Sequence, residues 1–324
     1  MEKYIFRQKV KSLLSFLCIL VLLPYVVTVF MNGSKITSAG NVKAAYIYFN
    51  NGERQQQVLW EEYFVGVLAK EIAADIELEA LKAQAVILRT SLYQELEQTK
   101  GNEVSMEYWS KEELEKKWGI NYAEYYDKFQ KAIRDTAGEV LMFNGSYAMV
   151  PFHQSSNGTT RNASEVWGTQ EYPYLTMKEC PEDKEAEEEL HIYRLPYQEI
   201  QEKCQADFVA VEEETAKRPL TFADFEIKEV DSAGYVTKLR IRNTILSGEQ
   251  FRQSLALASS AFSIKDGEDD ELVLTATGNG HGLGMSQWSA NKMAEKGNHY
   301  SDILAYFFEG TILEDAGEIF TKLE

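Results

Sequence analysis

Residues 62–93 read EYFVGVLAKEIAADIELEALKAQAVILRTSLY. In the second half, apolar residues recur three and four positions apart, at Leu78, Leu81, Ala85, Leu88 and Leu92. The first half shows the same spacing at Phe64, Val67, Leu68 and Ile72. Side chains at these spacings lie on one face of a helix. The stretch therefore predicts two consecutive helices, each with one apolar face.

Glu71 follows Leu68 by three residues and Val67 by four, so it falls on or beside the apolar face of the first helix. A carboxyl group held against apolar side chains is harder to ionise and can stay protonated long enough to donate a proton. Most glutamates instead keep the carboxylate in solvent. Periodicity leaves both interpretations of Glu71 open.

The residues of this stretch also resemble a known signature. AKEI at 69–72, followed by LEALKAQAVILRTSLY at 78–93, resembles that of the stage II sporulation protein D family, which includes amidase-enhancer proteins. These are bacterial cell-wall proteins, and the sporulation members resemble lytic transglycosylases in activity. The family pattern has a glutamate where this chain has Glu71 and an arginine where it has Arg89. It usually continues with Met-Pro, where this chain has Ile72-Ala73, so we expect the first helix to end less sharply.

Separated matches to the same family recur in order over most of residues 55–312. GHGLGMSQW at 280–288 resembles the closing motif nearly residue for residue, and ILAYFFEGT at 303–311 extends it. The hairpin ending in His153, EVWG at 165–168 and LSGEQFR at 246–252 also match. Some members resemble zinc proteins, with a histidine and nearby cysteines after this hairpin. Here that loop has serines and threonines and no cysteine, so we expect neither a metal site nor another cofactor.

The N-terminus predicts a membrane anchor. Residues 13–31 (LLSFLCILVLLPYVVTVFM) carry no charge and approach the ~20 residues that a helix needs to cross a bilayer. The basic residues before them predict a cytoplasmic N-terminus and an exported remainder. A cleaved signal peptide has a shorter apolar core, of ~7–15 residues, and a clearer cleavage site. We therefore expect a single-pass cell-membrane protein with its anchor in residues 1–34 and one exported domain at 35–324.

Charge and cysteine content limit the partners and the redox chemistry. The net charge of −18 argues against nucleic acid, whose phosphates need a basic surface. Cys180 and Cys204 would face an exported compartment, where a disulfide can persist. Their separation does not fit a zinc knuckle. A disulfide between them and two free thiols both remain open.

Turn and capping signals predict an α+β fold, with β-hairpins and separate helices around a cleft. Asn144-Gly145 between two apolar runs indicates a hairpin with a type I′ turn. A second hairpin is expected at 225–242, and a strand at 271–277. Ser247 and Gln250 fit a capping box, and Gly297 is a stop for the helix after residue 286. We expect residues 110–135 to form a solvent-facing helical insert, and the acidic run at 179–190 to be solvated within a polar insert at about 179–220.

The glycines of GNGHGLG alternate at 278–284 without matching G-x-G-x-x-G, and no Walker lysine follows. A nucleotide site is therefore not expected. His281 is the titratable group of this turn, and Gln287 follows at the start of the next helix. A histidine between glycines is more often a structural hydrogen-bonding group than a catalyst.

Ordinary glycoside hydrolysis uses two carboxylates that flank the bond, and only Glu71 stands out here. One carboxylate suffices in a lytic transglycosylase, where the C6 hydroxyl of N-acetylmuramic acid attacks C1 and leaves a 1,6-anhydro sugar. The resemblance thus implies Glu71 as the catalytic acid and base. Arg89 would orient Glu71 or a sugar substituent, although an arginine too close would lower the Glu71 pKa. His153, His281 and Gln287 would line the cleft and bind the sugar.

The resemblance implies peptidoglycan glycan strands, stripped of stem peptides, as the substrate during spore engulfment. It also implies a cell-wall amidase and other engulfment membrane proteins as partners. Two alternatives stay open. One is a non-catalytic glycan-binding activator of such an amidase. The other is a metallohydrolase that uses His153 and His281 with a carboxylate, which the lack of a short ligand pair such as H-E-x-x-H disfavours.

Overall fold

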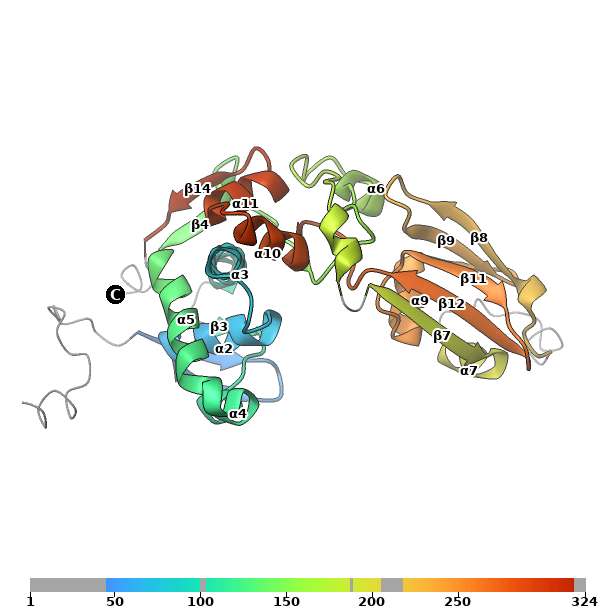
Figure 1. Ribbon diagram of the computed structural model, residues 1–324, viewed down its shortest axis with the longest axis horizontal. Coiled ribbons are helices and arrows are strands. Elements are labelled where there is room, and N and C mark those ends of the chain that lie inside the picture. Colours follow the sequence, from blue (N-terminus) through green and yellow to red (C-terminus); the bar gives the residue numbers. More distant parts are fainter. Residues whose placement is uncertain (1–44, 100–102, 187–188, 205–217, 318–324) are drawn as a thin grey trace, which may run out of the picture. The chain divides into compact units, whose positions relative to one another are not determined.

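The computed structural model describes residues 45–99, 103–186, 189–204 and 218–317. The anchor predicted at 13–31 lies outside these residues. In the part of the chain that is described, no helix is both long and apolar enough to cross a membrane. Small sheets alternate with separate helices (Figure 1), as expected of an α+β fold.

The first of two large hydrophobic cores surrounds α3 (Leu78–Thr99). Figure 1 shows α3 nearly end-on among its neighbours. The elements that contact it include α2 (Trp60–Glu71), α5 (Tyr122–Asp135), α10 (Gln287–Glu295), α11 (Tyr300–Phe307) and β4 (Glu139–Phe143). Because neighbours cover it on several sides, α3 buries polar residues as well as its predicted apolar face.

Two small sheets and a short helix complete this core. One sheet has the order β2-β1-β3, with β1 Tyr46–Asn50, β2 Gln55–Leu59 and β3 Glu103–Val104. The other has the order β14-β4-β5, with β5 Ser146–Tyr147 and β14 Ile312–Asp315. The short helix α4 (Lys111–Trp118) leads through a 3-10 turn at Gly119–Asn121 into α5.

The second core lies between two antiparallel sheets and two helices. One sheet has the order β11-β12-β7, with β7 Leu190–Pro196, β11 Phe262–Asp266 and β12 Glu271–Thr277. The other has the order β10-β9-β8, with β8 Phe225–Val230, β9 Val236–Ile241 and β10 Thr244–Leu246. The helices are α7 (Tyr197–Lys203) and α9 (Gly248–Leu255). Alternate residues of β12 are buried, as expected of a strand with one face on a core.

A short parallel ribbon pairs β6 (Phe152–His153) with β13 (Met285–Ser286), and we call it the β6–β13 ribbon. Gly284 precedes β13 with φ 70°. A Cβ there would lie 1.9 Å from the carbonyl oxygen of Pro151. The Met285 amide donates to that same oxygen at 3.0 Å. Glycine at 284 therefore lets the two strands approach.

Several local predictions are confirmed. Asn144 and Gly145 have φ of 50° and 79°, as a type I′ turn requires. Ser247 and Gln250 form a reciprocal capping box at the start of α9. Gly297 adopts φ 89° just after α10, and β8, β9 and β12 match the predicted strands.

The expected solvent exposure of two segments holds for most of their described residues but fails at particular positions. Within the predicted solvent-facing insert, α5 buries Phe129, Ala132 and Ile133 and packs against α3, because these residues form an apolar stripe on an otherwise polar helix. Within the acidic run, Cys180 and Asp183 have no exposed surface. Asp183 belongs to a 3-10 turn, Pro181–Glu185, and its partners are described below.

Candidate functional site

Glu71 is the last residue of α2. Ile72 leaves the helix with φ −141° and ψ 150° and turns its side chain into the core, so the expected gradual helix end is wrong. The last carbonyl groups of a helix have no partner within it. Gln287 Nε2, on α10, donates to the Glu71 carbonyl oxygen at 2.8 Å. The backbone that carries the Glu71 carboxyl is thereby fixed.

A pocket of about 810 Å³ opens at this helix end, and we call it the Glu71 pocket. Its walls come from the α2–α3 connection, the segment around α4, and the start of α10. The side chains that distinguish it are Glu71, Trp109, Trp118, Gln154, Gln287 and Trp288. Asp75 and Glu295 also line it, and Glu295 is ion-paired with Lys292 at 2.9 Å.

The Glu71 carboxyl has an environment suited to a proton donor. Its side chain is exposed to the water of the pocket, yet burial by the surrounding protein raises its pKa above the ordinary value. The neighbouring Lys70 opposes this and lowers the pKa. The negative end of the α2 dipole acts in the same direction as burial, since it disfavours a carboxylate at a helix C-terminus. The Glu71 carboxyl faces protein on one side and water on the other, which accounts for both its exposure and its raised pKa.

Tryptophan side chains provide flat surfaces in the pocket. The Lys117 ammonium lies 4.1 Å from the centre of the Trp109 ring, and that of Lys292 lies 5.2 Å from the centre of Trp288. Gly66 brings the Trp109 segment onto α2, because a Cβ there would lie 2.3 Å from the Trp109 carbonyl oxygen. Such aromatic faces can stack on the apolar faces of sugar rings.

Sequence reasoning missed the residue that holds the start of α10. Asp183 accepts hydrogen bonds from the Ser156 amide at 2.5 Å and from the hydroxyls of Ser286 and Ser289 at 2.8 and 2.7 Å. Burial raises its pKa, which these bonds partly offset. Asp183 thus positions the helix that carries Gln287 and Trp288. The acidic residues around Asp183 predicted a solvent-exposed segment, since a run of charged residues is normally solvated.

Arg89 lies in the core around α3, 2% exposed, and does not line the Glu71 pocket. Its guanidinium donates to the carbonyl oxygens of Ile133 and Glu139, both at 3.1 Å, and to the Thr136 hydroxyl at 3.3 Å. It also lies 5.0 Å from the centre of the Phe64 ring. These contacts tie α3 to α5 and β4. Lys70, not Arg89, is the cation that lowers the Glu71 pKa.

Replacing Arg89 with Ala is therefore expected to destabilise the fold by about 2–3 kcal/mol, because buried carbonyl groups lose their donors. Urea denaturation followed by circular dichroism measures this. Arg134→Ala removes an exposed arginine of α5 and serves as the control. Unchanged stability of the Arg89→Ala variant would contradict this structural role of Arg89.

His153 and His281 lie near each other, with ring centres 5.8 Å apart. His153 is 4% exposed, and its Nδ1 lies 3.0 Å from the Leu283 carbonyl oxygen as the donor. Burial lowers its pKa to about 3, with His281 contributing. Burial likewise lowers the pKa of His281, whose Nδ1 accepts from the Leu283 amide at 3.1 Å. Both rings are neutral at pH 7.

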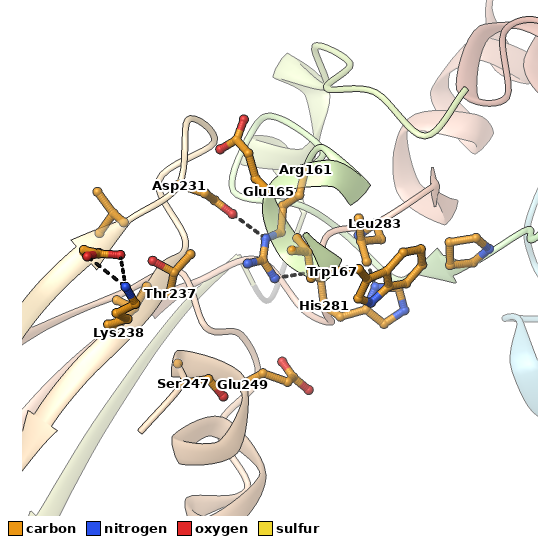
Figure 2. A pocket seen from close by; sticks show the side chains of 16 residues that line it. Arg161, Glu165, Trp167, Asp231, Thr237, Lys238, Ser247, Glu249, His281 and Leu283 are labelled. Atoms are coloured by element: carbon orange, nitrogen blue, oxygen red, sulfur yellow. Dashed lines mark hydrogen bonds and ion pairs between the residues drawn. The ribbon is translucent and has the colours of Figure 1, made fainter. Parts of the chain in front are cut away.

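The predicted site residues do not meet in one cleft. Gln287 lines the Glu71 pocket, whereas His281 lines a second pocket of about 780 Å³, drawn in Figure 2. We call this second pocket the Trp167 pocket. Within the described residues, no group of three or more His, Cys, Asp or Glu side chains could hold a metal ion.

The two cysteines of the described part are buried, and no disulfide joins them. Cys180 belongs to the core around α3 and Cys204 to the core between the two sheets. Burial raises the pKa of the Cys180 thiol to about 12. Of the two possibilities left open by the sequence, the structure has two thiols and no disulfide between them.

Comparisons with known proteins agree with the sequence motifs. A family model described as "Stage II sporulation protein" matches residues 49–143. The chain is 32% identical over 288 residues to "Stage II sporulation protein D" of Bacillus subtilis (strain 168), which covers 85% of this chain and 80% of that protein. It is 30% identical over 290 residues to the protein of the same name from Bacillus amyloliquefaciens, with the same coverage. "Amidase enhancer" of Bacillus subtilis (strain 168) is 24% identical over 291 residues, covering 76% of this chain and 40% of that protein.

Proposed function

Since the chain belongs to the stage II sporulation protein D family, we propose that it is a peptidoglycan lytic transglycosylase with Glu71 as its acid and base. The observation that carries this proposal is a carboxyl of raised pKa at a fixed helix end, in a pocket with tryptophan walls. We further propose that it acts outside the cell membrane during engulfment, on strands from which a partner amidase has removed the stem peptides.

The proposed reaction needs one carboxyl group. Protonated Glu71 gives its proton to the glycosidic oxygen as the C1–O bond breaks. The C6 hydroxyl of the same N-acetylmuramic unit bonds to C1, and the Glu71 carboxylate takes the hydroxyl proton. The products are a 1,6-anhydro end and a new free end on the other sugar, and Glu71 is protonated again. Trp109 and Trp288 would hold the flanking sugars, and Gln287 would position Glu71.

Product analysis tests the reaction type. The full-length protein is incubated with peptide-free glycan strands, and the new ends are identified by mass spectrometry. Anhydro-muramic ends support the transglycosylase. Reducing muramic ends would instead indicate a hydrolase with a second carboxylate, for which Asp75 is the available residue of the pocket.

A second candidate function is binding without cleavage, favoured by the similarity to a protein named amidase enhancer. The chain would then hold glycan and activate an amidase. Glycan binding without any new ends, combined with stimulation of an added cell-wall amidase, would establish this function and contradict the first.

The pH dependence of cleavage follows from the Glu71 pKa. Because the pKa is raised, the acid stays protonated to higher pH than an ordinary glutamic acid, and the rate falls as pH rises through it. Lys70→Met removes the cation that lowers this pKa, so the falling limb of the rate profile is expected to move to higher pH. Lys131→Met, at an exposed position outside the pocket, should leave the limb in place. If the falling limb of the Lys70→Met profile stays at the wild-type pH, a group other than Glu71 determines it.

A further inference from the structure

The Trp167 pocket is built from five separate segments of the chain, one of which is Pro151 before β6. Figure 2 shows Arg161, Glu165 and Trp167 from the segment around α6 (Ala163–Trp167), and Ser247 and Glu249 from the start of α9. The β8–β9 hairpin and the turn with His281 supply the other walls. Its volume, about 780 Å³, lies within the range of small-ligand sites, ~300–1,000 Å³.

An exposed tryptophan marks this pocket. Trp167 is 42% exposed. The Tyr172 ring packs against the Trp167 ring in an edge-to-face arrangement, with ring centres 5.3 Å apart. A large aromatic side chain normally buries more of its surface, and its exposure at a concave site is typical of a binding residue. The indole offers an apolar face on which a flat ligand, or the apolar face of a sugar ring, can lie.

The polar groups of the pocket are mostly acidic. Four carboxylates line it, at Glu165, Glu229, Asp231 and Glu249. Glu165 accepts from the amide and the hydroxyl of Ser232, and these bonds lower its pKa. It is therefore ionised at neutral pH and can accept hydrogen bonds from ligand hydroxyls.

The two cationic side chains that line the pocket are already ion-paired with its carboxylates. Arg161 Nε lies 2.6 Å from Asp231 Oδ2, and both side chains are buried. Lys238 Nζ lies 2.9 Å from Glu229 Oε2. The neutral His281 adds no positive charge. Arg252, which does not line the pocket, is ion-paired with Glu249 at 2.7 Å. The four carboxylates of the pocket therefore stand against three cations. A carboxylate on a ligand would still meet net negative charge, whereas hydroxyl and N-acetyl groups would meet hydrogen-bond acceptors.

The Trp167 pocket and the Glu71 pocket lie at opposite ends of the β6–β13 ribbon. Pro151 and Leu283 line the first, and Gln154 and Gln287 line the second. These positions are three and four residues apart in the sequence, which sets an upper limit of roughly 10–13 Å at ~3.3 Å per extended residue. An oligosaccharide is long enough to cover this distance.

We propose that the Trp167 pocket is a second glycan-binding subsite that selects the neutral N-acetylglucosamine unit over the lactyl-bearing N-acetylmuramic unit. This inference rests on the proposed function, since it takes a glycan strand as the ligand. A strand held at both ends of the ribbon is fixed in register. Selection of the neutral sugar at Trp167 then determines which glycosidic bond reaches Glu71.

The test is calorimetric binding of an N-acetylglucosamine tetrasaccharide to the full-length protein. Trp167→Ala is expected to weaken binding roughly tenfold, as for the loss of an aromatic contact at the centre of a site. Trp167→Phe should restore most of the affinity. Tyr48→Ala removes another exposed aromatic side chain, 44% exposed and outside both pockets, and should bind as the wild type does.

Charge selection is tested with Glu229→Gln, which releases Lys238 from its ion pair. This variant should narrow the preference for N-acetylglucosamine over N-acetylmuramic acid, with the two compared as single sugars. An unchanged preference would contradict the selection. Equal affinities of Trp167→Ala and the wild type for the tetrasaccharide would overturn the subsite itself.

The binding test needs no cleavage, so it separates the two proposals. Trp167-dependent binding without anhydro products would leave the subsite standing and reject the transglycosylase. Anhydro products together with binding that does not depend on Trp167 would support the transglycosylase and reject the subsite.

Discussion

Replacing Glu71 with Gln is expected to lower kcat for glycan cleavage by roughly 10²–10⁴-fold, the usual contribution of a general acid–base group. Glutamine has nearly the same shape but cannot supply the proton to the leaving oxygen. The hydrogen bond from Gln287 goes to the backbone of residue 71, so the fold and the KM should change little. The initial rate of formation of anhydro-muramic ends measures the effect, and thermal unfolding checks the fold.

Asp75→Asn is the matched control, because Asp75 lines the same pocket and is exposed four residues further along. It should retain most of the wild-type rate. Loss of activity in both variants would point to a pair of carboxylates and hence to a hydrolase. A rate for Glu71→Gln within about threefold of the wild type would remove Glu71 from the chemistry, since a general acid contributes far more.

Replacing Gly284 with Ala is expected to cost more than about 4 kcal/mol of stability, which is exceptional for a single substitution. The new Cβ would meet the Pro151 carbonyl oxygen at 1.9 Å, a contact with backbone that no side-chain movement can relieve. Its φ of 70° adds strain for any residue with a Cβ. The β6–β13 ribbon would separate, and both pockets would lose a wall. Urea denaturation measures the loss, or soluble yield where the variant does not fold.

Gly145→Ala separates the cost of the steric contact from the cost of the positive φ. Gly145 has φ 79°, and a Cβ added there would meet no atom within 4 Å. This variant therefore carries only the conformational cost of a positive φ, about 1–2 kcal/mol. Similar losses in both variants would mean that the close approach at Gly284 contributes nothing.

Most of the local structure could be predicted because its causes are local. The Asn144-Gly145 turn needs positive φ at two adjacent residues, and the Ser247–Gln250 capping box needs donors and acceptors three residues apart. The misjudged segments were those whose burial depends on distant partners. Asp183 is buried because Ser286 and Ser289, about a hundred residues later, satisfy its oxygens.

The candidate site was only partly predictable for the same reason. Glu71 stood out by its place on an apolar stripe and by its motif. Trp109 lies in a connection without periodicity, so no sequence signal placed it beside Glu71. Arg89 was marked by the same motif, yet its guanidinium is bound within the core around α3.

Residue order was enough to assign the family, the α+β class, the individual helices and turns, and Glu71 as the candidate acid. These depend on motifs and on short-range backbone chemistry. The folded chain was needed to show that α2 ends at Glu71, that Gln287 donates to that end, and that His281 belongs to a different pocket. A pKa, a pocket wall and a buried ion pair depend on tertiary structure because they are set by groups that packing brings together from distant parts of the chain.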